Sequence, residues 1–335
     1  MSEPATHDAR AAPRLAWARA ALHLPEAGLE RASTDAGFRS YWRTVGTAPS
    51  RIVMDSPPDK EDVRPWLRIR DVLEAGGVRV PQVLARDVDA GFLLLEDLGG
   101  PTVAQVIDAS NADAHMAAAI AQLVRLQSIP LPADMPVFGE ALLQRDAGLF
   151  EDWFVRRHLG IELDCGDSER LELAQRRLMD NALAQPRVPT HRDYMPRNLM
   201  PVDGGPAVLD FQDLVLGPVA YDPVSLLRDA FLSWPEPRVD GWLRDYHARA
   251  VAAGVRVPAL DVFLRDADWC GVQRHQKILG IFARLHHRDG KPHYLADAPR
   301  FLAYLDMVVP KYRALDPLRE LLDRTIKPAF AQVAA

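Results

Sequence analysis

The feature that most restricts what this chain can fold into is a polar loop followed by a short predicted hairpin. The loop is THRDYMPRN at residues 190–198, and a second polar segment, VLDFQD, occupies residues 208–213. Apolar residues flank the turn sequence DGG at 203–205 on both sides, a pattern typical of a β-hairpin. If those three turn residues form the loop of the hairpin, Asn198 lies directly opposite Asp210.

The predicted pairing gives this hairpin the ligands of a hard cation. Opposed residues on paired strands have Cβ atoms about 4.5–5.5 Å apart, and amide and carboxylate oxygens are suitable ligands for such an ion. Asp193 precedes the first arm and can accept the proton of an attacking hydroxyl, so the three side chains predict a phosphoryl-transfer site. The alternative is a turn or capping aspartate before an ordinary hairpin, because Asp residues are common at turns.

These segments also resemble a known family. The pattern HxDxxxxN at residues 191–198, followed by DF at 210–211, is similar to the catalytic loop and metal-binding aspartate of the protein-kinase-like fold. With GP at 217–218 and YDP at 221–223, it resembles the aminoglycoside phosphotransferase branch of that fold. Within that branch, the residues HRDYMPRNLM at 191–200 and DFQD at 210–213 are similar to those of the anomeric sugar kinases of cell-wall recycling. Those enzymes phosphorylate N-acetylmuramate and N-acetylglucosamine.

The resemblance implies an α+β, protein-kinase-like, two-lobed fold. We expect a small lobe over residues 1–95, which binds the nucleotide and contains an antiparallel β-sheet of five strands with a helix. We expect a larger, mainly helical lobe over residues 96–335, which carries catalysis and substrate binding. ATP and Mg²⁺ are the cofactors that this family implies.

The resemblance also assigns roles to individual residues. Asp193 is expected to be the catalytic base, and Asn198 and Asp210 are expected to bind the metal. Glu96 and Leu98 fall at the hinge, where backbone groups of the family meet the adenine edge. We expect His191 to support the loop by hydrogen bonding. Asp222 precedes a proline and is interpreted as the N-cap of the next helix, hence as structural.

The third predicted strand departs from the family pattern. Kinases carry a lysine there that contacts the nucleotide phosphates, but this position falls on Asp55, or on Met54 if the count shifts by one. Arg39, Arg43 and Arg51 lie nearby in sequence and can supply the missing charge. We take Arg43 as the candidate, although each of these arginines can equally be a solvated strand residue. Residues 33–37 form the turn that takes the place of the phosphate-covering loop.

A long helix predicted from Trp269 to His287 carries a basic face. Arg274, Lys277, Arg284 and Arg288 recur at helical spacing and therefore share one side. We interpret this face as a binding surface for an anionic substrate, with Arg284 and Arg288 as the substrate-binding residues. The alternative is an ordinary solvated face, since charged helix faces are common on globular domains.

Composition limits the partners of the chain. It has 335 residues, of which 48% are hydrophobic and 26% charged, and its net charge is -6. An acidic chain is not expected to bind nucleic acid or an anionic membrane as its main partner. No apolar run is long enough for a membrane span and the N-terminus has no signal-peptide pattern, so we expect a cytoplasmic protein. The two cysteines indicate no disulfide framework, and the sequence leaves the oligomeric state open.

We therefore predict an ATP-dependent kinase that phosphorylates the anomeric hydroxyl of an N-acetyl amino sugar. One alternative is a kinase for a cationic acceptor such as an aminoglycoside or choline, which would need an acidic pocket where this chain has a basic helix. A second is a non-catalytic kinase-like binding protein, which the missing lysine favours and the joint presence of Asp193, Asn198 and Asp210 disfavours. A protein kinase is disfavoured because the segment between Phe211 and Pro223 is too short for an activation segment.

Overall fold

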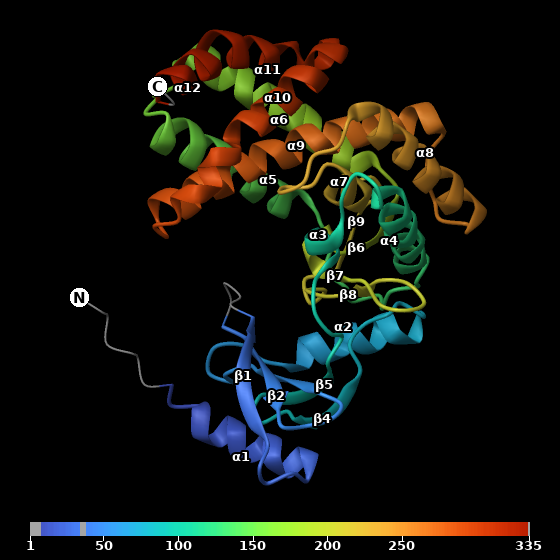
Figure 1. Cartoon of the computed structure of the whole chain (residues 1–335). Coiled ribbons are helices and arrows are strands. Elements are labelled where there is room, and N and C mark those ends of the chain that lie inside the picture. The colour runs from blue at the N-terminus through green and yellow to red at the C-terminus, as the bar shows by residue number, and fades with distance from the viewer. Residues whose placement is uncertain (1–7, 34–37, 334–335) are drawn as a thin grey trace. The chain divides into compact units, whose positions relative to one another are not determined.

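A computed structural model of the chain describes residues 8–33 and 38–333 (Figure 1). These residues form two compact units. The first consists of the chain up to Val106 together with Arg197–Gln212, and the second consists of Ile107–Pro196 and the chain from Asp213 onward. Most of the turn expected to replace the phosphate-covering loop, residues 34–37, lies outside the described residues.

The first unit is built on the expected five-stranded antiparallel sheet, with strand order β1-β2-β3-β5-β4. Its strands are β1 (Gly28–Ser33), β2 (Ser40–Val45), β3 (Arg51–Asp55), β4 (Val83–Asp87) and β5 (Phe92–Glu96). Val53 and Met54 point to opposite faces, and both are fully buried, so both faces of the central strand are covered. The continuous apolar run at the start of β5 is buried for the same reason.

Helices cover this sheet on its two sides. They are α1 (Ala11–Leu22) and α2 (Arg64–Ala75), and a short helix, α3 (Val103–Val106), follows the last strand. Ala18 of α1 packs against Val53 and Leu94, and the Trp17 ring stacks on Phe92 with centroids 5.5 Å apart. Figure 1 shows α2 on the side of the sheet opposite α1.

The hairpin after the polar loop belongs to the first unit, which differs from the expected division at residue 95. Its arms are β7 (Leu199–Met200) and β8 (Ala207–Val208). The Val208 amide donates to the Arg79 carbonyl at 2.8 Å, and the Phe211 ring lies 5.0 Å from the Trp66 ring of α2. These long-range contacts attach the hairpin to the sheet unit, a relation that sequence order does not reveal. The roles assigned to the two lobes stay predictions.

The second unit is mainly helical and contains one two-stranded antiparallel pair, β6 (Arg187–Thr190) with β9 (Val215–Pro218). Its longer helices are α4 (Ala112–Gln127), α5 (Glu140–Leu149), α6 (Cys165–Ala184), α7 (Tyr221–Leu227), α8 (Glu236–Ala252), α9 (Leu260–His287), α10 (Ala298–Val308), α11 (Asp316–Leu321) and α12 (Lys327–Val333). Two π-helical segments, η1 (Phe150–His158) and η6 (Leu322–Ile326), extend α5 and α11. Short 3₁₀ turns are η3 (Pro292–Asp297), η4 (Val309–Lys311) and η5 (Arg313–Leu315), and η2 (Pro196–Asn198) leads from the loop to the hairpin.

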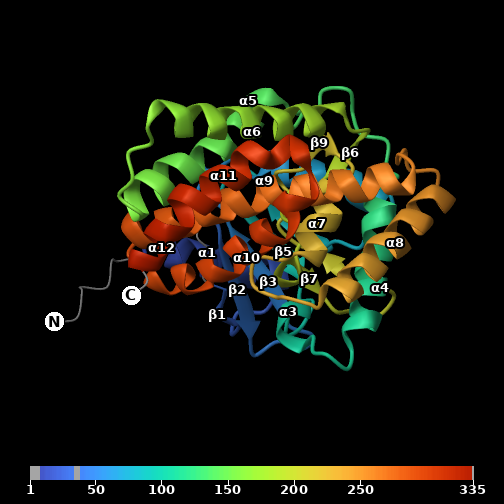
Figure 2. The same ribbon diagram turned by 90° about the horizontal axis from the view of Figure 1, so that it is seen from above.

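Helix α9 is the central element of this unit. It has 28 residues and begins nine residues before the predicted start at Trp269. α5, α6 and α10 pack against it (Figures 1 and 2). A Cβ atom at Gly280 would lie 2.3 Å from the Leu149 carbonyl oxygen, so α9 approaches the end of α5 at a distance that a side chain would prevent. No helix in the described part of the chain combines the length and apolar character that crossing a membrane requires.

Candidate active site

The polar loop is held by a buried carboxylate, that of Asp222. Its two oxygens accept hydrogen bonds from the backbone amides of His191 and Arg192, at 2.6 and 3.0 Å. Arg192 has φ 75°, a left-handed conformation that is uncommon for a non-glycine residue, and these bonds stabilise it. Burial raises the pKa of Asp222 to about 6. The predicted N-cap role is wrong, because α7 begins at Tyr221 and its N-cap is Ala220.

Two aromatic side chains fix the rest of the loop. The His191 Nδ1 accepts a hydrogen bond from the Asp193 amide at 3.3 Å, which confirms the expected supporting role of this fully buried histidine. The Tyr194 hydroxyl donates to the Ala119 carbonyl of α4 at 2.9 Å. The backbone on both sides of Asp193 is thus tied to buried parts of the second unit.

Asp193 itself presents a partly exposed carboxylate. Its side chain is 49% exposed, and its Oδ1 lies 3.7 Å from Nη2 of the buried Arg274. Desolvation by the surrounding protein would raise the pKa of Asp193, but the charges of Arg274 and Lys277 outweigh it, and the pKa lies below its usual value. The carboxylate is therefore ionised at neutral pH and able to accept a proton.

A buried network from α9 surrounds the loop. Arg274, only 3% exposed, donates from Nη1 to the Arg192 carbonyl at 3.0 Å and to the Tyr221 hydroxyl at 3.3 Å. Lys277 lies 2.8 Å from the carboxylate of Asp146 on α5. Sequence periodicity had placed Arg274 and Lys277 on the basic face, but it could not identify Asp146, because no local pattern links α5 with α9.

The predicted register of the hairpin is wrong by one residue. Leu199 pairs with Val208 rather than with Leu209, so Asn198 faces Leu209 and accepts its amide hydrogen at 2.9 Å. The cause is the turn: Asp203-Gly204 forms a two-residue loop, with Gly204 at φ 84°, instead of the supposed three-residue loop. A shift of one residue removes the direct opposition of Asn198 and Asp210.

Asp210 nevertheless has a defined conformation, directly after Leu209, the residue that faces Asn198. Its φ is 60°, in the left-handed region, and Gln212 Nε2 donates to its Oδ1 at 2.7 Å. The described residues include no cluster of three or more His, Cys, Asp or Glu side chains that could hold a metal. Mg²⁺ beside a nucleotide commonly takes only one or two protein oxygen ligands, together with phosphates and water. Asn198 and Asp210 fit that requirement, and both belong to the first unit, whereas Asp193 belongs to the second.

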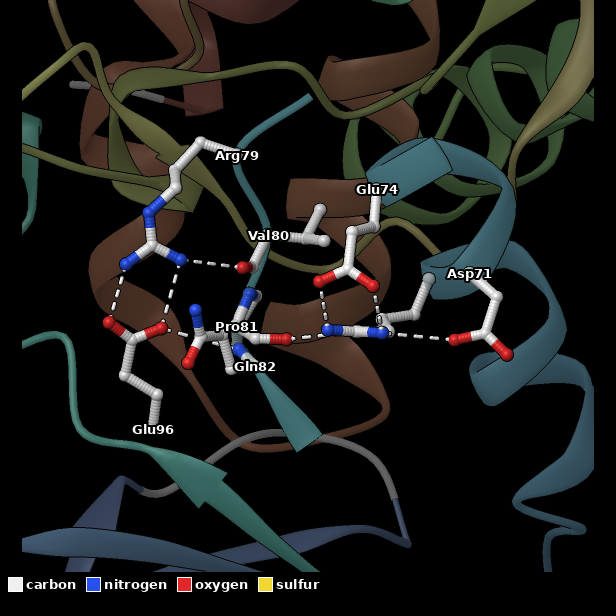
Figure 3. A network of polar contacts seen from close by, with 8 residues as sticks. Asp71, Glu74, Arg79, Val80, Pro81, Gln82 and Glu96 are labelled. Carbon is white, nitrogen blue, oxygen red and sulfur yellow. Dashed lines mark hydrogen bonds and ion pairs between the residues drawn. The ribbon is translucent and has the colours of Figure 1, made fainter. Parts of the chain in front are cut away.

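The predicted hinge begins at a structural ion pair. Arg79 donates from Nη1 to Glu96 at 2.9 Å and to the Val80 carbonyl at 2.8 Å, and Figure 3 shows this contact beside Pro81 and Gln82. The hydrogen bond from Arg79 lowers the pKa of Glu96. The Glu96 amide donates to the Gln82 carbonyl at 2.9 Å. The Glu96 amide is therefore already engaged within the sheet, and the assignments of Glu96 and Leu98 stay predictions.

Arg43 is engaged in holding the same segment. It donates from Nε and Nη2 to the two carboxylate oxygens of Asp97, at 2.7 and 3.1 Å, and from Nη2 to the Gly99 carbonyl at 2.9 Å. The bonds to Asp97 raise the pKa of Arg43. This placement makes Arg43 a tie between β2 and the hinge, and it does not support the expected role in binding phosphate.

Asp55, at a strand position where the family carries a lysine, forms ion pairs with two arginines. Asp55 is 2% exposed and binds Arg10 Nε at 2.7 Å and Arg14 Nη1 at 2.8 Å, both from the region of α1. Asp55, one of the two strand positions predicted for the lysine, thus serves to attach the N-terminal helix to the sheet.

The two arginines predicted to bind the substrate differ in their surroundings. Arg288 is 56% exposed and donates to the carboxylate of its neighbour Asp289 at 2.6 and 3.0 Å. Arg284 is partly buried, and its Nε atom has no hydrogen-bond partner among the described residues. Burial and the charge of Arg288 lower the pKa of Arg284. Arg284 is therefore the better candidate for contact with an anion.

Comparison with known proteins defines the class of this chain. Residues 28–260 match the model of the phosphotransferase enzyme family, and the chain belongs to that family. Solved structures with the same protein-kinase-like fold include the ADP-bound aminoglycoside phosphotransferase APH(2'')-Ib, with a TM-score of 0.58 and 16% identity over 89% of this chain and 97% of that one. The Plasmodium vivax ethanolamine kinase Pv091845 has a TM-score of 0.60 and 10% identity over 90% and 88% of the two chains.

Closer relatives point to one group within the family. The chain is 48% identical to an N-acetylmuramate/N-acetylglucosamine kinase of Pseudomonas putida, over 89% of this chain and 88% of the relative. It is 43% identical to a protein of the same name from Neisseria meningitidis, over 91% and 93% of the two chains. The expected family and the two-lobed α+β fold are thereby confirmed.

Proposed function

We propose that this chain is an ATP-dependent kinase that phosphorylates the anomeric hydroxyl of N-acetylmuramate, N-acetylglucosamine or both, in the recycling of cell-wall sugars. The observation that carries the proposal is the ionised, partly exposed carboxylate of Asp193, held by Asp222, His191 and Arg274. The names of relatives at 48% and 43% identity support the choice of acceptor. We propose a cytoplasmic location for the activity, because ATP is available there.

In the proposed reaction, Asp193 accepts the proton of the anomeric hydroxyl. The hydroxyl oxygen forms a bond to the γ-phosphorus of ATP, the bond from that phosphorus to the β–γ bridging oxygen breaks, and ADP leaves. An anomeric hydroxyl is more acidic than other sugar hydroxyls, so it suits a base whose pKa is low, as is that of Asp193. Arg274 keeps the carboxylate ionised and orients the loop through the Arg192 carbonyl.

Asn198 and Asp210 are the residues proposed to hold Mg²⁺, which, when bound, neutralises charge on the phosphates. Gln212 fixes the Asp210 carboxylate for that task. We propose Arg284, and with a smaller contribution Arg288, as ligands of the lactyl carboxylate of N-acetylmuramate, because arginine recognises carboxylates through charge-assisted hydrogen bonds. The cations beside Asp193 disfavour a cationic acceptor such as choline.

A methyl glycoside provides the direct test, since it blocks the anomeric oxygen and leaves the other hydroxyls intact. We expect phosphorylation of free N-acetylmuramate and N-acetylglucosamine, and none of their methyl glycosides. Inhibition of the free sugar by the methyl glycoside is the control that the blocked sugar still binds. Equal rates on the free and blocked sugars contradict anomeric transfer, and turnover of only choline or an aminoglycoside in the same panel contradicts the acceptor class.

A further inference from the structure

Arg39 has a nearly buried guanidinium whose hydrogen bonding is incomplete. Its side chain is 13% exposed, and Nη2 forms an ion pair with Glu61 at 3.1 Å. The second terminal nitrogen, Nη1, is buried and has no hydrogen-bond partner in the described part of the chain. A buried charged donor without a partner is costly, so a ligand that offers it an acceptor would be stabilised there.

Arg39 lies on the same side of the sheet as Met54, the other strand position predicted for the missing lysine. Tyr41 of β2 pairs with Met54, and Ser40 pairs with Asp55. Side chains alternate along a strand, so Arg39, one residue before β2, falls on the side of Tyr41 and Met54. Asp55 faces the opposite side, where Arg10 and Arg14 bind it. Glu61 precedes α2, and α2 also lies on the side away from α1 (Figure 1).

Other arginines of the first unit are engaged elsewhere. Arg43 is shared between Asp97 and the Gly99 carbonyl. Arg51 donates from Nη1 to the Ser50 carbonyl at 3.2 Å. Arg14 is bound by the carboxylates of Asp55 and Asp8. Arg39 differs from these three arginines in having a buried terminal nitrogen without a partner among the described residues, on a guanidinium that already has an orienting carboxylate.

We propose that Arg39 binds the phosphates of the nucleotide in place of the strand lysine, and that Glu61 positions it. The inference rests on the proposed use of ATP. Kinases pair their phosphate-binding lysine with a glutamate, and the Arg39–Glu61 pair provides the same combination of charges from different positions. A guanidinium can donate two parallel hydrogen bonds to phosphate, which gives arginine the geometry for this role.

The test compares the binding of ATP, ADP and adenosine to purified full-length protein by calorimetry. We expect Arg39→Gln to weaken ATP and ADP binding about 10- to 100-fold, the usual value of a charge-assisted hydrogen bond, and to change adenosine binding by less than about two-fold. Arg39→Lys should restore part of the loss. Arg64→Gln, which removes an exposed arginine of the same unit, is the matched control and should behave as wild type.

The outcomes distinguish a role of Arg39 in binding phosphate from a role in stabilising the fold. Equal weakening of ATP and adenosine, or a loss of thermal stability in Arg39→Gln that Arg39→Lys does not repair, shows that Arg39 only stabilises the fold. Unchanged ATP binding also overturns the inference. A wild-type protein that binds ATP with the expected dependence on Arg39 but phosphorylates no sugar contradicts the proposed acceptor alone, and one that binds no nucleotide contradicts both.

Discussion

One helical face carries arginines both in the middle of α9 and at its C-terminal end, where Arg288 is the C-cap residue, and the protein surrounds these two halves of the face differently. Arg274 is buried, binds the backbone of the polar loop at residues 190–198 and lies 3.7 Å from Asp193. Arg288, fourteen residues later, is 56% exposed and is neutralised by Asp289. The comparison shows that a shared helical face defines only the direction in which side chains point. Burial decides whether a charged side chain interacts with other protein groups or is exposed to solvent.

The largest expected effect comes from removing the group on which the buried half acts. Asp193→Asn retains the shape of the side chain and removes the base, so kcat should fall about 10²–10⁴-fold. The Kd for ATP should change little, and this can be measured by calorimetry alongside initial rates. In the Asp193→Asn background, adding Arg274→Gln should lower kcat much less than it does in wild type, because the two residues act together. Wild-type turnover in Asp193→Asn contradicts the assignment of the base.

The pH dependence of the reaction separates the two halves of the helix. Arg274 lowers the pKa of Asp193, and the proposed mechanism requires an ionised carboxylate there. Arg274→Gln should therefore raise that pKa and move the acid limb of the kcat/KM profile to higher pH. Arg288→Gln, in which an exposed and already paired charge is lost, is the control and should leave the limb in place. If both variants shift the limb equally, the electrostatic difference between the two halves does not exist.

The smallest effects are expected from the exposed half, and they concern substrate choice. Arg284→Ala should raise KM for N-acetylmuramate several-fold and leave KM for N-acetylglucosamine nearly unchanged, since only the former has a carboxylate. Arg288→Ala should produce a weaker effect in the same direction, because Asp289 competes for its guanidinium. Steady-state kinetics with both sugars measures this. A similar rise in KM for the two sugars would place these arginines outside the carboxylate site.

Local patterns in the sequence determined the family and the fold class, and they selected the polar loop as the candidate site. The number of residues between His191 and Asn198 is set by the chain itself, so this motif can be read without knowledge of the tertiary structure. The run of apolar residues in β5 and the turn residues around Gly204 likewise predicted a buried strand and a hairpin, because period and turn chemistry act over a few residues. The relatives at 48% identity confirm what these segments predicted about class.

The tertiary structure decided the relations that join distant segments. Because the turn is the two-residue loop Asp203-Gly204, the pairing register of the hairpin differs by one residue from the predicted register. The choice between a loop of two and a loop of three residues depends on how the arms pack. Asp222 binds the loop rather than capping its own helix, and Lys277 meets Asp146 across two helices. Periodicity reports which side of an element a residue occupies, whereas burial and partners depend on what packs against that side. For that reason Arg274 and Arg288 look alike in the sequence and differ in the fold.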